Sequence, residues 1–147
     1  MQNMVRKMKD IIRISIKGES GYCSAEEAYK DKVTITRDSI RYEYRPLYGG
    51  SETNIARNWS YKTTSSVFQK KFDELAALVP EVLTREEIPF VTDIGESTFV
   101  ITYSDKSKKT RSFFLPGDEF ISVFSIVKQM VPGCEYIPAV LLTSEDY

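Results

Sequence analysis

Apolar and polar residues alternate along several stretches of the first half of the chain, a pattern typical of half-buried β-strands. In residues 12–17, isoleucines at every second position alternate with polar residues. Residues 32–46 alternate in the same way on both sides of residues 37–39, whose composition is typical of a tight turn. The pattern therefore predicts one strand followed by a β-hairpin.

A loop and a further strand are expected after this hairpin. Residues 47–54 contain two glycines and several small polar residues, which is a loop composition. Residues 57–63 alternate again and predict another strand. Because alternate residues of a strand point to opposite sides, Trp59 and Tyr61 are expected on one face.

The period of the apolar positions changes to that of a helix after residue 63. Ser66, with Gln69 three residues later, fits a capping box at the start of this helix. Pro80 is expected to end the helix because proline disfavours helical geometry in the preceding residue. Residues 81–87 add a short further turn at most. The apolar positions share one helical face, and they are Phe68, Phe72, Leu75 and Val79.

The second half of the chain repeats this order of elements. Residues 88–94 are a possible strand, and residues 98–103 and 109–115 predict a hairpin. Asp118 is the expected N-cap of a second helix, and Pro132 is expected to stop it. The apolar face of this helix is formed by Phe120, Phe124, Val127 and Val131.

The two halves correspond at a single offset of 52 residues. At this offset Phe68 matches Phe120, and Phe72 matches Phe124. The match indicates either an internal repeat of strands followed by a helix, or only the features common to any strand–helix junction, namely a cap, an apolar face and a stop. In both cases the predicted fold is a single α+β domain over residues 1–147. It has an antiparallel sheet of about six or seven strands with two helices packed on one face.

Neither a membrane helix nor a signal peptide is predicted. No stretch approaches the roughly 20 apolar residues that cross a bilayer. The basic N-terminal segment, residues 1–10, leads into no uninterrupted apolar region, so we expect a cytoplasmic protein. The acidic residues 143–147 are expected to form a mobile tail.

The chain has no histidine, which removes the commonest general base and the commonest metal ligand. Cys23 and Cys134 lie far apart, and neither has a ligand partner at zinc spacing. The carboxylates occur mainly in local pairs, such as Glu26 and Glu27, whose side chains diverge. No phosphate-binding glycine motif is present. We therefore predict a non-enzymatic protein without metal or cofactor, with a small carboxylate- or tyrosine-dependent enzyme as an alternative.

Charge is distributed unevenly, although the chain has 20 basic and 21 acidic residues. Residues 32–63 carry six basic and three acidic side chains, and residues 98–117 carry four and one. Residues 64–97 carry three basic and seven acidic side chains, and residues 118–147 carry one and five. The predicted hairpins are thus basic, and the helices with their loops and tail are acidic. Such segregation marks either a solvated face or a binding surface.

A sheet covered by helices on one side leaves its other face free for a partner. Strand alternation places Arg41, Glu43 and Arg45 opposite the apolar face. The candidate binding residues on the free face are Arg41, Glu43, Arg45, Arg57 and Lys62. The leading hypothesis is an intracellular protein-binding module, an inhibitor or regulator of another protein. The alternative is a single-stranded nucleic-acid-binding protein, although alternation puts Tyr42 and Tyr44 on the apolar face.

Three segments carry a resemblance to known proteins. Residues 131–147 read VPGCEYIPAVLLTSEDY, residues 38–44 read DSIRYEY and residues 59–64 read WSYKTT. Together they resemble a family of small uncharacterised bacterial proteins, and the resemblance covers most of the chain. It implies a domain of unknown function and supplies no site residues. Small size and the lack of catalytic groups suit an inhibitor, for example of a host defence nuclease.

Overall fold

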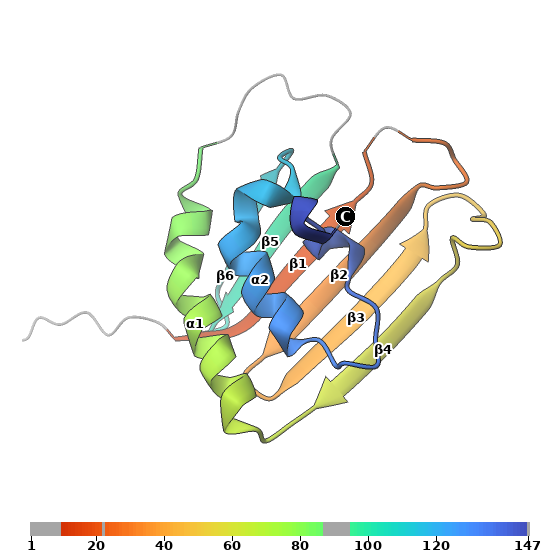
Figure 1. Cartoon of the computed structure of the whole chain (residues 1–147). Helices are drawn as coiled ribbons and strands as arrows, with labels where there is room; N and C mark the ends of the chain where they lie inside the picture. Colours follow the sequence, from red (N-terminus) through yellow and green to blue (C-terminus); the bar gives the residue numbers. More distant parts are fainter. Residues whose placement is uncertain (1–9, 22, 87–94, 147) are drawn as a thin grey trace, which may run out of the picture.

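The computed structural model describes residues 10–21, 23–86 and 95–146 as one antiparallel sheet with helices on one face (Figure 1). This confirms the predicted α+β fold, with six strands. The predicted strand at residues 88–94 and most of the basic segment 1–10 lie outside the described residues. The elements are β1 (Ile11–Glu19), β2 (Tyr29–Thr36), β3 (Ser39–Pro46), β4 (Arg57–Lys62), α1 (Ser66–Leu83), β5 (Glu96–Tyr103), β6 (Lys108–Phe113) and α2 (Ile121–Met130).

The strand order is β4-β3-β2-β1-β5-β6, so that β1 lies at the centre between β2 and β5. Figure 1 shows α1 and α2 over the half of the sheet formed by β6, β5 and β1, whereas β3 and β4 extend beyond them. We call the side that carries the helices the helix side, and the opposite side the open face. None of the helices in the described part of the chain is long and apolar enough to cross a membrane.

Most apolar residues of the alternating strands point to the helix side; Val100 opposes Ser15 and lies on the open face, and Ile12 at the bulge of β1 is exposed. Phe99 packs against Phe113, Phe120 and Phe124 with ring centroids 5.2–6.3 Å apart. Burial of these side chains is the main source of stability for a domain of this size. The largest fully buried side chains are Phe99, Phe113, Phe124, Ile14, Ile16, Ile35, Ile40, Leu75, Ile101, Leu141, Val33 and Val127.

Helix α1 differs from its prediction at both ends. The N-cap is Ser65 rather than Ser66, because the Ser65 side chain accepts the Phe68 N–H. Pro80 does not end the helix, which continues to Leu83. Proline removes one hydrogen bond near the helix end, and burial of Val82 against the core offsets that loss.

The start of α2 also corrects a prediction. A 3₁₀ turn, Gly117–Phe120, precedes the helix, and Asp118 is not its N-cap. Its carboxylate accepts the Ser144 N–H at 2.6 Å and so ties the C-terminal segment to the helix start. The buried Phe120 ring positions this turn in place of a side-chain cap. Helix α2 ends at Met130, shortly before Pro132, as expected.

The acidic C-terminal residues 143–146 are held by hydrogen bonds, which corrects the prediction of a mobile tail for the described residues. These residues include a 3₁₀ turn, Ser144–Asp146, at whose end the Asp146 carboxylate lies. This carboxylate accepts the Thr143 N–H at 2.9 Å and also bonds Lys128 of α2. Leu141 is fully buried just before this turn, so the segment belongs to the core.

A hairpin followed by a helix occurs twice, as β3-β4-α1 and as β5-β6-α2. The matched pairs Phe68 and Phe120, and Phe72 and Phe124, are all buried. The two helices begin differently, since the residue that matches Ser66 lies inside the 3₁₀ turn before α2. A common origin of the two halves stays a prediction.

Candidate binding surface

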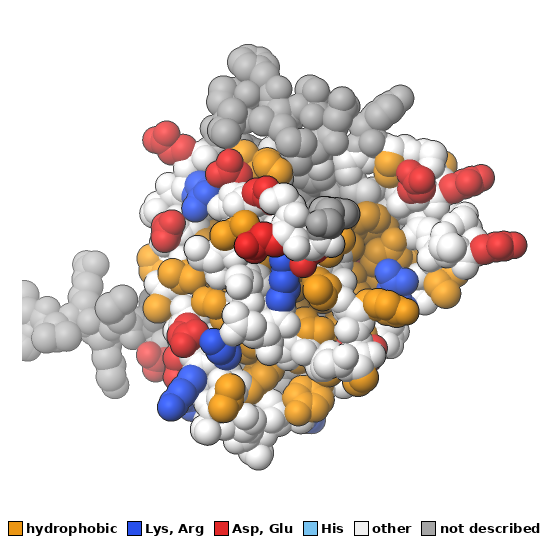
Figure 2. All heavy atoms as spheres, in the orientation of Figure 1, with side chains coloured by type: hydrophobic (Ala, Val, Ile, Leu, Met, Phe, Trp, Pro, Cys, Tyr) orange, Lys and Arg blue, Asp and Glu red, His pale blue; other side chains and the backbone are white. Residues whose placement is uncertain are grey.

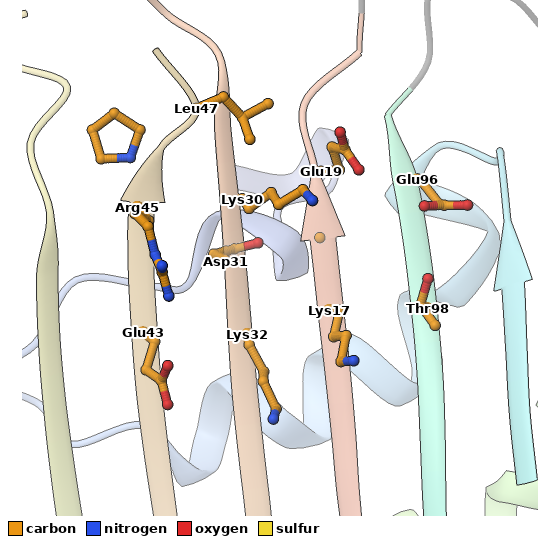
Figure 3. A pocket seen from close by; sticks show the side chains of 12 residues that line it. Lys17, Glu19, Lys30, Asp31, Lys32, Glu43, Arg45, Leu47, Glu96 and Thr98 are labelled. Atoms are coloured by element: carbon orange, nitrogen blue, oxygen red, sulfur yellow. The ribbon is translucent and has the colours of Figure 1, made fainter. Parts of the chain in front are cut away.

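The open face carries two rows of charged side chains that run across β3, β2, β1 and β5 (Figure 3). Residues that oppose each other across antiparallel strands point to the same face, and the strand registers therefore define the rows. The first row consists of Arg45, Lys30, Glu19 and Glu96. The second row consists of Glu43, Lys32, Lys17 and Thr98. These side chains line an open depression of about 530 Å³.

Four cations of this depression lack an acidic partner, and we call Lys17, Lys30, Lys32 and Arg45 the cationic patch. None of them forms an ion pair with another described residue. Neighbouring Glu43 pairs instead with Arg41 at 2.6 Å. By strand geometry the Cα atoms of the patch span about 12 Å. Four cations beside the carboxylates of Glu19 and Glu96, with Glu43 paired to Arg41, leave an excess of positive charge on this part of the open face.

The helix side has a different character. Figure 2 shows it with several acidic side chains around the edges and hydrophobic side chains between them. Lys128, which is one of its cations, is neutralised by Asp146. The segregation of charge along the sequence thus becomes in part a separation between the two faces of the sheet. The cations of β1, β2 and β3 project to the open face, whereas Arg111 of β6 bonds the end of α1 on the helix side.

Four of the five predicted binding residues lie on the open face. They are Arg41, Glu43, Arg45 and Lys62. Arg57 is the exception and corrects the prediction: it opposes Tyr44, and its guanidinium lies over the Tyr44 ring at 4.4 Å on the helix side. This placement could have been predicted from the sequence, because Arg57 lies two residues before Trp59 and four before Tyr61, and alternate residues of a strand share one face.

Sequence reasoning missed Lys17, Lys30 and Lys32. Lys32 could have been found from the hairpin register, which sets it opposite Glu43. Lys17 could not, because its position next to Lys32 depends on the pairing of β1 with β2 across a long connection.

All aromatic side chains of the described strands lie on the helix side. Tyr42 and Tyr44 are buried there, as expected. The described strands therefore offer no ring on the open face on which a base could stack, a feature that distinguishes them from sheets that bind single strands. The other strand aromatics on the helix side are Tyr29, Trp59, Tyr61, Phe99, Tyr103 and Phe113.

Behind the cationic patch, on the helix side, Asp31 anchors the C-terminal segment. Its Oδ2 atom accepts the Tyr42 hydroxyl at 2.7 Å and the Val140 N–H at 2.9 Å. The Tyr42 hydroxyl in turn accepts the Ala139 N–H at 3.2 Å. Burial raises the pKa of Asp31 to about 6, although the hydrogen bonds from Tyr42 and Val140 act in the opposite direction. The carboxyl is covered by the chain itself, so its position is structural.

A second polar cluster holds the loop between β3 and β4. The Asn54 amide donates to the backbone oxygens of Glu26 at 2.8 Å and Ala28 at 3.1 Å. Its oxygen accepts the Tyr44 hydroxyl. This cluster fixes the loop beside the start of β4 and holds the Tyr44 ring over which Arg57 stacks.

Among the described residues, no group of three or more Cys, Asp or Glu side chains could hold a metal ion. Cys23 and Cys134 are both exposed and free. The cationic patch is therefore the arrangement of functional groups on which a proposal about function can rest.

No protein-family model and no curated protein matches the chain. The resemblance to small bacterial proteins stays a prediction from three sequence segments.

Proposed function

We propose that the chain is a non-enzymatic intracellular protein that binds an acidic surface of a partner protein through its open face, as an inhibitor or regulator of that partner. The cationic patch carries this proposal. Charged groups that a fold leaves without partners, on strands paired on both sides, are available for intermolecular pairing. Their positions are set by the sheet, so little backbone ordering is needed on binding.

The composition of the open face favours a protein over a nucleic acid. A nucleic-acid strand presents a continuous run of negative phosphates. Glu19 and Glu96 continue the first row of the patch, and Glu43 begins the second. These carboxylates repel a continuous polyanion, whereas a protein surface can match both signs and so fix its register.

The binding is expected to depend on salt. The patch is exposed to solvent, where the Debye length is about 8 Å at physiological ionic strength. Charges in such a position mainly raise the association rate and select among partners. A partner should therefore bind faster at low ionic strength, and apolar contacts at the rim, such as Leu47, would add to the affinity.

Charge reversal of the patch is the direct test. We expect Lys17→Glu combined with Lys32→Glu to lower the affinity for a copolymer of glutamate and lysine with glutamate in excess by about tenfold or more, because like charges then face each other. The measurement is a fluorescence titration at low salt, repeated with a thymidine oligonucleotide.

The matched control is Lys70→Glu combined with Lys71→Glu on α1, which changes the net charge by the same amount on the helix side. Equal losses in the two double variants would show attraction by net charge alone and contradict the proposal. Tighter binding of the oligonucleotide than of the mixed-charge copolymer would favour the nucleic-acid alternative.

A further inference from the structure

The two edges of the sheet are protected to very different degrees. Edge strand β6 carries Lys108, Lys109 and Arg111, and charges of this kind discourage pairing with another strand. Edge strand β4 has a charge only at each end, and five of its six residues are exposed. It pairs with β3 in an uninterrupted register without a bulge. Figure 1 shows β4 at the edge that extends beyond the helices.

The backbone groups on the outer side of β4 can be assigned from the ladder. The Thr63 N–H donates to the Asp38 oxygen at 2.9 Å. Hydrogen-bonded and non-bonded pairs alternate along antiparallel strands. Arg57, Trp59 and Tyr61 therefore direct their backbone groups to β3. The outward N–H and C=O groups belong to Asn58, Ser60 and Lys62.

We propose that β4 pairs antiparallel with β4 of a second copy about a two-fold axis at Ser60. Outward residues must oppose outward residues in such a pair, so the axis can lie at Asn58, Ser60 or Lys62. An axis at Lys62 sets two like charges directly opposite each other, which is unfavourable. An axis at Asn58 sets Ser60 opposite Ala56, outside the strand. Only the axis at Ser60 uses the full strand without opposing like charges.

The side chains complement each other in this register. On the helix side Trp59 of one copy opposes Tyr61 of the other, and the two-fold axis repeats the pair. Tyr61 is 44% exposed in the single chain, and cross-strand aromatic pairs stabilise antiparallel sheets. On the open face Asn58 opposes Lys62, and Ser60 opposes Ser60. The interface is self-complementary, as a two-fold dimer requires.

A dimer of this kind continues the sheet through the axis. Both open faces then lie on the same side, and the two cationic patches belong to one surface. The inference rests on the edge and register of β4 and holds whichever partner binds the open face. Since a contact between two six-residue edge strands buries little area, the dimer should be in equilibrium with the monomer.

The first test is the mass in solution. Sedimentation velocity over a dilution series should show a species of twice 16.9 kDa that dissociates on dilution. Ser60→Pro removes one outward N–H and leaves the bonds to β3 in place, so it should be monomeric at every concentration. Ser60→Ala keeps the N–H and should retain the dimer. A monomeric wild-type protein at all concentrations overturns the inference.

The second test fixes the register and does not depend on proline in a strand. In a background with Cys23→Ser and Cys134→Ser, Ser60→Cys should form a disulfide-linked dimer on mild oxidation. Asn58→Cys should not, because in this register the two Asn58 Cα atoms are roughly 14 Å apart along the strand, beyond the reach of a disulfide. Equal cross-linking of the two variants, or none with Ser60→Cys, contradicts the proposed pairing.

Discussion

Replacing Gly18 by alanine is expected to lower the free energy of unfolding by about 3 kcal/mol, at the upper end of the usual cost of overpacking. A Cβ atom at this position overlaps Asp31 Oδ1 and lies 2.7 Å from the Val140 Cβ atom. Neither neighbour can move freely: Asp31 is hydrogen-bonded to Tyr42, and Val140 is buried. The substitution therefore displaces the C-terminal segment from the sheet.

Urea denaturation of the two proteins measures this effect. Gly133→Ala is the matched control, because a Cβ atom there meets no other atom within 4 Å. If the two alanine variants had equal stability, the docking of the C-terminal segment over Gly18 would be wrong. Loss of the near-ultraviolet signal without loss of the sheet would agree with displacement of this segment.

The free energy of unfolding is expected to fall by about 3 kcal/mol as the pH rises from about 3 to about 7, because of Asp31. Burial raises the pKa of this carboxyl from 3.8 to about 6. Because the pKa is higher in the folded state, the stabilisation that the protonated Asp31 carboxyl contributes is fully present below pH 3.8. This contribution is lost as the pH rises through about 6. In this interval the unfolded chain ionises Asp31 while the folded chain keeps it protonated.

Asp31→Asn should remove this slope, because the amide does not ionise and still offers an acceptor to the Val140 N–H. Glu52→Gln, which removes an exposed loop carboxylate, should keep the slope. Asp118 and Asp146 affect stability in a different pH range. The hydrogen bond from the Ser144 N–H lowers the pKa of Asp118, and the hydrogen bond from Lys128 lowers the pKa of Asp146. Their contribution is lost only as the pH falls below the usual carboxyl range. An unchanged slope in Asp31→Asn would refute the assignment.

The hairpin of β2 and β3 could be predicted because its information is local. The alternation on both sides of residues 37–39 selects the buried face of each strand, and the short turn sets Thr36 opposite Ser39. The apolar faces of α1 and α2 followed from spacing in the same way. Asp31 could also have been noticed, since it shares strand parity with Val33 and Ile35 and so places a carboxyl on an apolar face.

Element boundaries were less predictable because tertiary contacts compete with local rules. Pro80 disfavours a helix, but burial of Val82 extends α1 beyond it. Aspartate is a residue type favoured at helix N-caps, but the Asp118 carboxylate accepts the backbone N–H of Ser144, which is far along the chain. A capping interaction is worth about 1 kcal/mol, so a few buried contacts can override it.

The sequence by itself determined the α+β fold, the basic character of the hairpins, the acidic character of the helices taken with their loops and tail, and the absence of histidine. These properties follow from composition and from periodicity, which act over neighbouring residues. Only the tertiary structure decided that β1 lies between β2 and β5, and so placed Lys17 beside Lys32. Strand order depends on contacts between distant segments, whose energies no local pattern records. The cationic patch and the exposed edge of β4 are both consequences of that order.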